Sequence, residues 1–155
     1  MTKIIFVCFG NICRSPMAEF VMKNLVARAG LEKDFQIESA GTHPSIGTPL
    51  SNGTAHELIK NNVPFTRRTS VQLNSWDYKH FDYLIGLDRS NIRDMRDICG
   101  GDPDKKMSLL MDWAGKTGKE IEDPWNTGDF DGILKQLEQG CAGIIQSLRR
   151  LLYTN

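Results

Sequence analysis

Residues 3–16 read KIIFVCFGNICRSP, and they indicate how the chain begins to fold. Residues 3–8 form a short apolar run rich in β-branched and aromatic side chains, which is typical of a strand buried on both faces. A glycine-containing turn follows, and Ser15 can then cap a helix whose first position suits Pro16. The stretch therefore predicts a strand, a tight loop and a helix in direct succession.

The same alternation continues along the chain. Apolar runs predict further strands at 35–40, 81–87 and 107–111. Further helices are expected at 51–61, 88–97 and about 130–152. Irregular structure is expected at 41–50 and 112–129. Alternating strands and helices imply right-handed crossovers, so we expect a single α/β domain over residues 1–155, with a parallel sheet flanked by helices on both faces.

Charge and composition argue against several classes of function. Lys and Arg total 19, as do Asp and Glu, so no net charge draws the chain to nucleic acid or to an anionic membrane. No apolar stretch approaches the roughly 20 residues of a membrane span. The N-terminus also lacks the features of a signal peptide. We therefore expect a cytoplasmic protein without a nucleic-acid or membrane partner.

The cysteine pattern indicates thiol chemistry rather than a metal site. In a reducing cytosol the cysteines should remain thiols. They are scattered along the chain at Cys8, Cys13, Cys99 and Cys141. With only three histidines in addition, a structural zinc site is not expected.

The loop that follows the first strand is predicted to bind an anion. It leaves the carboxyl end of the strand and enters a helix N-terminus, where ligands sit in open α/β sheets. Backbone N–H groups of residues 9–15 can point at one tetrahedral anion. Gly10 permits close approach of the backbone, and Asn11 tolerates a left-handed conformation. Arg14 adds a planar fork suited to two phosphate oxygens.

Cys8 stands at the start of this loop. The same donors and the helix dipole favour its thiolate form, which would make it an activated nucleophile. A lone cysteine at the end of a buried strand is more often a small core residue. That alternative fails here because Cys, Gly, Asn, Arg and Ser-Pro occur together at a strand-to-helix junction. A Walker-type nucleotide loop is excluded because the sequence lacks GK[ST].

Cys8, five intervening residues, Arg14 and Ser15 resemble the signature of the low-molecular-weight protein tyrosine phosphatases. The likeness covers nearly the whole chain, with VCFGNICRSPMAE at 7–19, SAGT at 39–42, LDRSN at 87–91 and DPW at 123–125. It implies a flavodoxin-like four-stranded parallel sheet, a cysteinyl-phosphate intermediate and no metal or organic cofactor. It also implies that the substrates are tyrosine-phosphorylated proteins or peptides, and that phosphate and other oxyanions inhibit.

The resemblance also implies roles for individual residues. Asn11 and Ser39 match a supporting hydrogen bond that holds the phosphate loop in shape. Ser15 matches the hydroxyl that stabilises the leaving thiolate. Phosphate binding and support are therefore expected from Phe9, Gly10, Asn11, Ile12, Cys13, Ser15 and Ser39.

Asp123 is the expected general acid and base. Two-step cleavage of a phosphate ester needs a proton donor for the leaving group and a base for water, and one carboxyl group can serve both in turn. Pro124 restricts the conformation of Asp123 and so helps to hold its carboxyl group in place. Asp-Pro alone is a common turn dipeptide, but the match to the family's DP motif favours the catalytic role.

Two aromatic residues are expected to line the substrate slot. Trp125 would form an apolar wall beside the acid, and Phe9 part of the floor. The alternative for Trp125 is partly buried packing. Many relatives carry an aromatic residue in the loop after SAGT, whereas residues 43–50 read HPSIGTPL here, so one side of the slot should be more open. We assign no role to TRRTS at 66–70, which departs from the family's His-x-x-Arg pattern.

Cys13 follows Cys8 within the same loop, and the family uses such a pair for reversible inactivation through a disulfide. A buried spacer is an equally good interpretation of Cys13.

Three other functions share parts of this sequence pattern. A phosphoarginine phosphatase on the same scaffold carries Thr where this chain has Ile12. A related arsenate reductase needs two further closely spaced cysteines, but Cys99 and Cys141 are far apart. A non-catalytic phosphate-binding module would need neither Cys8 nor Asp123.

Overall fold

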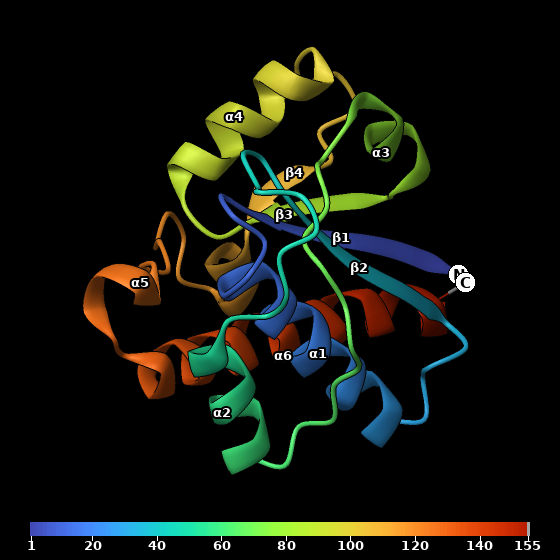
Figure 1. Ribbon diagram of the computed structural model, residues 1–155. Coiled ribbons are helices and arrows are strands. Elements are labelled where there is room, and N and C mark those ends of the chain that lie inside the picture. The colour runs from blue at the N-terminus through green and yellow to red at the C-terminus, as the bar shows by residue number, and fades with distance from the viewer. Residues whose placement is uncertain (155) are drawn as a thin grey trace.

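The computed structural model describes residues 1–154, with side chains described through Arg150 (Figure 1). Its centre is a four-stranded sheet in the order β2-β1-β3-β4, with every neighbouring pair parallel. The strands are β1 (Thr2–Cys8), β2 (Phe35–Gly41), β3 (Tyr83–Gly86) and β4 (Met107–Leu109). The predicted α/β class and four-stranded parallel sheet are confirmed. The predicted domain also included Asn155, which lies outside the described residues.

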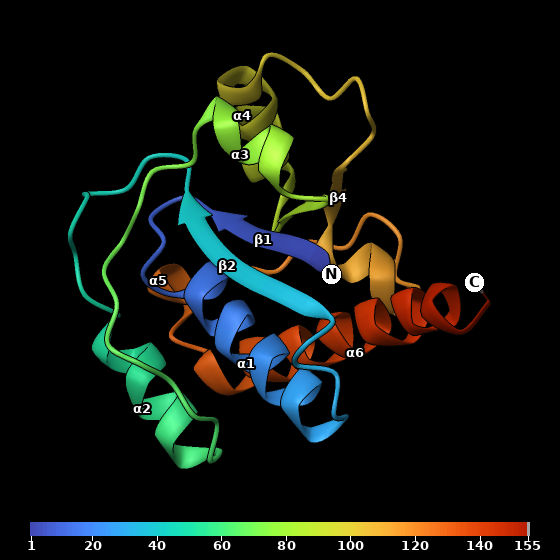
Figure 2. The same cartoon turned by 90° about the vertical axis from the view of Figure 1, so that its right-hand side faces the viewer.

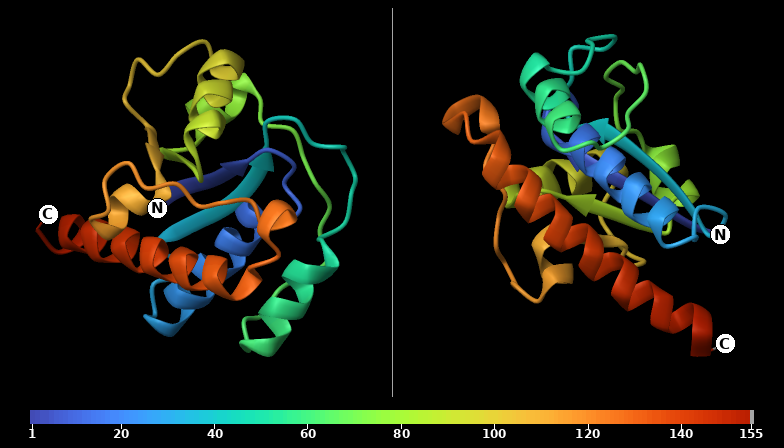
Figure 3. Two further views of the ribbon diagram at one scale, coloured as in Figure 1. Left: turned by 90° about the vertical axis from the view of Figure 1, so that its left-hand side faces the viewer. Right: turned by 90° about the horizontal axis from the view of Figure 1, so that it is seen from below.

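Helices cover both faces of the sheet, with α1 and α6 on one face and α3 and α4 on the other (Figures 1 and 2). The helices are α1 (Arg14–Arg28), α2 (Asn52–Lys60), α3 (Ser75–His80), α4 (Arg89–Cys99), α5 (Pro124–Thr127) and α6 (Phe130–Thr154). A 3-10 helix, η1 (Leu110–Ala114), follows β4 directly. The long helix α6 runs alongside α1 and closes the core on that face (Figure 3).

The central strand β1 alternates its side chains between two apolar clusters, as the strand period of two requires. Ile4 and Phe6 are fully buried in the cluster beneath α1 and α6. Ile5 and Val7 are buried in the cluster beneath α3 and α4. The prediction of a strand buried on both faces is thereby confirmed. This burial anchors β1 and delivers Cys8 at the carboxyl edge of the sheet.

The structure corrects several local predictions. Ser15 is not the N-cap of the first helix, because α1 begins at Arg14 and Cys13 occupies the cap without a side-chain hydrogen bond. The Ser15 hydroxyl faces Cys8 instead. Of the segment predicted as a strand at 107–111, the last two residues belong to η1. The short helices α3, α5 and η1 were not predicted, although Asn74 and Asp77 form a readable capping box for α3.

Two long connections run side by side past the carboxyl end of β2 (Figure 2). One joins β2 to α2 and the other joins α2 to α3. The second forms one bridge to the end of β2, Gly41↔Gln72, and one to the first connection, Pro49↔Thr69. At Gly41 a Cβ atom would lie 2.8 Å from the Phe9 carbonyl oxygen, so only glycine allows this close approach to the loop after β1. Each connection also bonds directly to the Cys8 loop, the first through the His43 N–H to the Phe9 carbonyl and the second through the Val71 N–H to Asn11 Oδ1.

None of the helices formed by residues 1–154 is both long enough and apolar enough to cross a membrane. The described residues also contain no group of three or more His, Cys, Asp or Glu side chains placed to hold a metal ion.

Candidate active site

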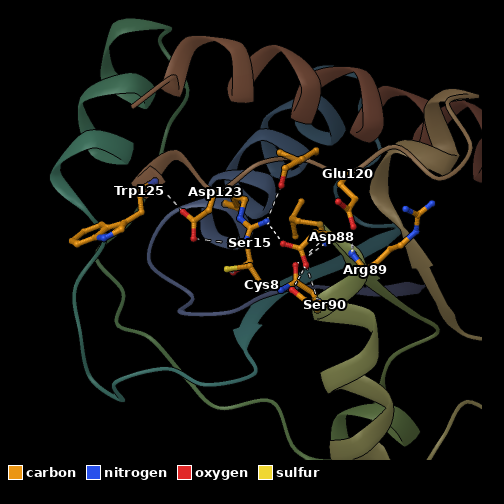
Figure 4. Close-up of polar contacts among 12 residues, drawn as sticks. Cys8, Ser15, Asp88, Arg89, Ser90, Glu120, Asp123 and Trp125 are labelled. Atoms are coloured by element: carbon orange, nitrogen blue, oxygen red, sulfur yellow. Dashed lines mark hydrogen bonds and ion pairs between the residues drawn. The ribbon is translucent and has the colours of Figure 1, made fainter. Parts of the chain in front are cut away.

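The loop between β1 and α1 forms one side of a pocket of about 350 Å³. Seven consecutive residues, 8–14, line the pocket, and Asp123 and Trp125 close it from the other side. The pocket therefore joins two segments that are more than 100 residues apart in the sequence. It brings together the predicted nucleophile, phosphate clamp and general acid (Figure 4).

Cys8 is buried at the start of the loop, with a side chain 3% exposed. Its sulfur lies 2.9 Å from Ser15 Oγ and accepts a hydrogen bond of 3.3 Å from the Asn11 backbone N–H. Hydrogen-bond donors at these positions stabilise negative charge on sulfur. The Cys8 sulfur thus has a backbone N–H and a hydroxyl group directed at it from inside the loop.

Asn11 holds the loop in its shape. It is fully buried with a φ of 56°, in the left-handed region that a non-glycine residue enters only when its surroundings compensate. Its Nδ2 donates to Ser15 Oγ at 2.9 Å and to Ser39 Oγ at 3.0 Å. Its Oδ1 accepts from the Val71 N–H at 3.0 Å and from the Arg68 guanidinium. The structure thus brings the predicted pair of Asn11 and Ser39 together.

Arg14 is held from behind by two acceptors. Its side chain is 3% exposed, and Nη1 donates to Asp88 Oδ2 at 2.7 Å and to the Ile121 carbonyl at 2.8 Å. Nη2 lies 3.8 Å from Asp123 Oδ2. These contacts fix the plane of the guanidinium at the pocket, as binding two oxygens of one phosphate requires.

Asp88 was not predicted as a site residue. It caps α4 and binds Arg14 at the same time. Burial by itself would raise the pKa of Asp88, but hydrogen bonds from Ser90, from Arg14 and from a backbone amide outweigh it and lower the pKa below the usual range. Asp88 is therefore charged at neutral pH and orients Arg14. The capping pattern in LDRSN was the only local signal, and it does not reveal the contact with Arg14.

Asp123 lies across the pocket from Cys8 (Figure 4). It is the N-cap of α5, and its Oδ1 accepts a 3.0 Å hydrogen bond from the Trp125 N–H. Pro124 takes the first position of that short helix, where its fixed φ is favourable. The Asp123 side chain is 34% exposed, so its carboxyl group is accessible to solvent.

The aromatic residues stand at the mouth of the pocket. Trp125 is 78% exposed, so partly buried packing does not describe it. Phe9 is 52% exposed and stacks on His43, with ring centroids 5.0 Å apart. Phe9 therefore belongs to the rim rather than to the floor where it was predicted. His43 supports that rim from the loop predicted to lack an aromatic wall.

Cys13 is buried, and its thiol is directed at Ser51, the N-cap of α2, with a sulfur to oxygen distance of 3.2 Å. Burial raises the pKa of Cys13, so it is a thiol at neutral pH. Burial likewise raises the pKa of Cys141, which lies in the core under α1.

A parallel sheet that delivers a cysteine into an anion-binding loop, with an arginine in the same loop and a carboxyl group opposite, is the arrangement of a cysteine-dependent phosphatase. Comparison with known proteins identifies the family. Residues 3–152 match the family model of the low molecular weight phosphotyrosine protein phosphatases.

Individual relatives agree with this match over almost their whole length. The low molecular weight protein-tyrosine-phosphatase YfkJ of Bacillus subtilis is 33% identical over 152 residues, covering 97% of each chain. Its crystal structure superimposes with a TM-score of 0.92 over 97% of this chain and 96% of that one. PtpA of Staphylococcus saprophyticus, with the same family name, is 34% identical over 94% of this chain and 92% of its own. The chain therefore belongs to the low-molecular-weight protein tyrosine phosphatase family and is a phosphoric monoester hydrolase.

Proposed function

We propose that this phosphatase hydrolyses phosphotyrosine in proteins or peptides through a cysteinyl-phosphate intermediate on Cys8. The observation that carries the proposal is the placement of the Cys8 sulfur and the Asp123 carboxyl group on opposite sides of one pocket. A nucleophile and a proton donor facing each other suit in-line displacement at a phosphorus atom bound between them.

In the first step the Cys8 thiolate attacks phosphorus, and the S–P bond forms as the bond to the tyrosine oxygen breaks. Asp123 gives its proton to the departing phenolate oxygen, which prevents the build-up of a poorly stabilised anion. The three remaining phosphoryl oxygens are bound by the N–H groups of the loop and by the Arg14 fork. The positive end of α1 adds to this stabilisation.

In the second step water attacks the phosphocysteine and the S–P bond breaks. The Asp123 carboxylate, now deprotonated, takes the proton of the attacking water. The electron pair of the broken bond returns to sulfur, where the Ser15 hydroxyl at 2.9 Å stabilises the thiolate. Inorganic phosphate leaves and Asp123 is again protonated, so the cycle needs neither a metal nor an organic cofactor.

The rim of the pocket supports an aromatic substrate. The Phe9 and Trp125 side chains are exposed next to the loop, where they can contact a phenyl ring while its phosphate reaches Cys8. A phosphoserine side chain is shorter and would not span the same depth. Ile12 adds apolar surface and no hydrogen-bond acceptor for a guanidinium, which favours phosphotyrosine over phosphoarginine.

The direct test is to measure phosphate release from one peptide carrying phosphotyrosine, phosphoarginine or phosphoserine at the same position. We expect kcat/KM for phosphotyrosine to exceed the others by at least about 100-fold, the range that a fitted pocket can supply. Acid-quench trapping should yield a phosphorylated Cys8 peptide. A preference for phosphoarginine would support the rival phosphatase, and absence of all turnover would support a binding module.

A further inference from the structure

Arg68 brings a positive charge to the back of the phosphate loop. It lies in the connection between α2 and α3, and its Nη2 donates to Asn11 Oδ1. Its second terminal nitrogen, Nη1, is buried and has no hydrogen-bond partner among the residues that the structure describes. A partly buried guanidinium with one buried, unpaired nitrogen reduces stability. A charge kept at this cost suggests that the positive charge of Arg68 has a function that a neutral side chain could not perform.

The contacts with Arg68 and with the Val71 N–H together fix how the Asn11 side chain is oriented. The amide oxygen of Asn11 accepts from Arg68 and from the Val71 N–H, and its nitrogen donates to the hydroxyls of Ser15 and Ser39. A guanidinium and a backbone N–H can only donate hydrogen bonds. The amide oxygen must therefore face them, and the amide nitrogen must face the two serines.

The hydrogen bonds of Asn11 lead through Ser15 to the Cys8 sulfur. Ser15 Oγ accepts from Asn11 Nδ2, so its own hydrogen is left for another acceptor. The Cys8 sulfur is 2.9 Å away, whereas the Ala40 carbonyl is 3.4 Å away. The Ser15 hydroxyl is thus placed to donate to the sulfur, and such a donor would favour the thiolate. Arg68 lies at the other end of this chain of donors.

Opposite charges flank the network. Ser39 Oγ donates to Glu19 Oε1 at 2.7 Å, so Glu19 terminates one branch as an acceptor. Burial lowers the pKa of Arg68, while the negative charges of Glu19 and Cys8 counteract that change. Arginine nevertheless stays protonated at physiological pH. The guanidinium therefore attracts negative charge at Cys8 as well as holding Asn11.

We propose that Arg68 is a positioning residue of the catalytic loop, which directs the Asn11 and Ser15 hydrogen bonds toward Cys8 and favours its thiolate. The proposal rests on the proposed role of Cys8 as nucleophile. Arg68 acts through its neighbours, since its hydrogen bond goes to Asn11 and not to the sulfur.

Alkylation of Cys8 by iodoacetamide tests the proposal without any substrate. The reagent is neutral, so its approach is not steered by charge, and the modified Cys8 peptide can be followed by mass spectrometry as a function of pH. In Arg68→Met we expect the alkylation rate at pH 6 to fall about tenfold and the profile to move to higher pH, as for the loss of one nearby cation. Arg68→Lys, which keeps a cation that can only donate, should recover most of the rate.

Arg67→Met is the matched control, because Arg67 is the adjacent residue and is exposed. It should react like the parent enzyme. An unchanged profile in Arg68→Met, or an equal change in Arg67→Met, would overturn the proposal. If Arg68→Met does not fold, Arg68→Gln provides the uncharged comparison with Arg68→Lys under the same expectations. Failure of the proposed phosphatase function would appear separately, as absent turnover in the parent protein.

Discussion

Asp88 Oδ2 accepts a 2.7 Å hydrogen bond from Arg14 Nη1, and it joins the N-terminus of α4 to the base of the catalytic pocket. The two residues are 74 positions apart. Arg14 is thus oriented by a helix on the opposite face of the sheet. This contact predicts a dependence of stability on pH that is specific to Asp88.

Asp88→Asn keeps the size and capping ability of the side chain but removes its charge. Because the pKa of Asp88 is lower in the folded state, its contribution to stability is complete above its unfolded pKa of about 3.9 and is lost as pH falls through the folded value. We expect the variant to lose about 1–2 kcal/mol of unfolding free energy at pH 7 and much less near pH 2. Urea denaturation at both pH values measures this difference.

Asp97→Asn is the control, because Asp97 is an exposed carboxylate on the same helix. It should change stability little at either pH. An Asp88→Asn penalty that persisted undiminished in acid would show that the charge of Asp88 is not what stabilises its contact with Arg14.

Cys8→Ser should separate binding from turnover. In the proposed mechanism backbone N–H groups and Arg14 bind the anion, and the substitution leaves them in place, whereas a serine hydroxyl is a far weaker nucleophile at neutral pH. We expect the affinity for inorganic phosphate, measured by calorimetry, to change less than about threefold while phosphatase activity disappears. Arg14→Lys should lose both, because an ammonium group cannot replace the bidentate fork. Substantial activity in Cys8→Ser would remove Cys8 from its proposed role.

Trp125→Ala should weaken the binding of phosphotyrosine peptides without affecting inorganic phosphate. The indole is exposed at the rim and would contact the ring of the substrate rather than its phosphate. We expect KM for a phosphotyrosine peptide to rise about three- to tenfold, as for loss of one aromatic contact of about 1 kcal/mol. Trp76→Ala, which removes a tryptophan of similar exposure on α3, is the control. Equal effects of the two substitutions would argue against a substrate wall at Trp125.

Hydrogen peroxide should inactivate the enzyme by oxidising Cys8, and Cys13 should make this inactivation reversible. Peroxide converts the Cys8 thiolate to a sulfenic acid, and attack by the Cys13 sulfur would form the disulfide with loss of water. The Cys13 thiol must first leave Ser51 and lose a proton, and burial has raised its pKa, so capture should become faster as pH rises. Mass spectrometry should detect the Cys8 to Cys13 cross-link.

In Cys13→Ala the Cys8 sulfenic acid cannot be captured, so further peroxide should oxidise it to a sulfinic acid that thiol reductants do not reverse. Cys99→Ala should behave like the parent, since Cys99 lies near Asn74 at α3. Full recovery of Cys13→Ala after peroxide treatment would contradict a protective role for Cys13.

Asp123→Asn should slow the first chemical step in proportion to how much the leaving group needs a proton. Tyrosine phenolate has a conjugate-acid pKa of about 10, so its departure gains strongly from proton donation. We expect the burst rate with a phosphotyrosine peptide to fall about 10²- to 10⁴-fold, and the burst with p-nitrophenyl phosphate to fall much less. Rapid-quench measurement of both bursts makes the comparison. Equal slowing would mean that Asp123 positions the substrate or its loop and is not the proton donor.

The local sequence was sufficient for much of the fold. Residues 3–16 carry a strand, a loop and a helix whose signals lie next to each other, and the structure confirms all three elements. One error arose where a side chain had a competing partner, and others arose where short helices or the end of β4 gave weak local signals. Ser15 was predicted to cap α1, but its hydroxyl faces Cys8, since Asn11 and Cys8 meet it inside the loop.

The residues proposed for the chemistry, Cys8, Arg14 and Asp123, could be selected from the sequence because each lies in a short motif that resembles the family's. Their supports could not be read in this way. Asp88, Arg68 and Ser51 reach the loop from three distant segments, and each looks locally like an ordinary cap or surface charge. Parallel crossovers bring the carboxyl ends of the strands, and the connections that follow them, to one edge of the sheet. Hydrogen bonds between such segments depend on packing over the whole domain. Only the tertiary structure could therefore show that Arg14 bonds to Asp88 and that Asn11 bonds to Arg68.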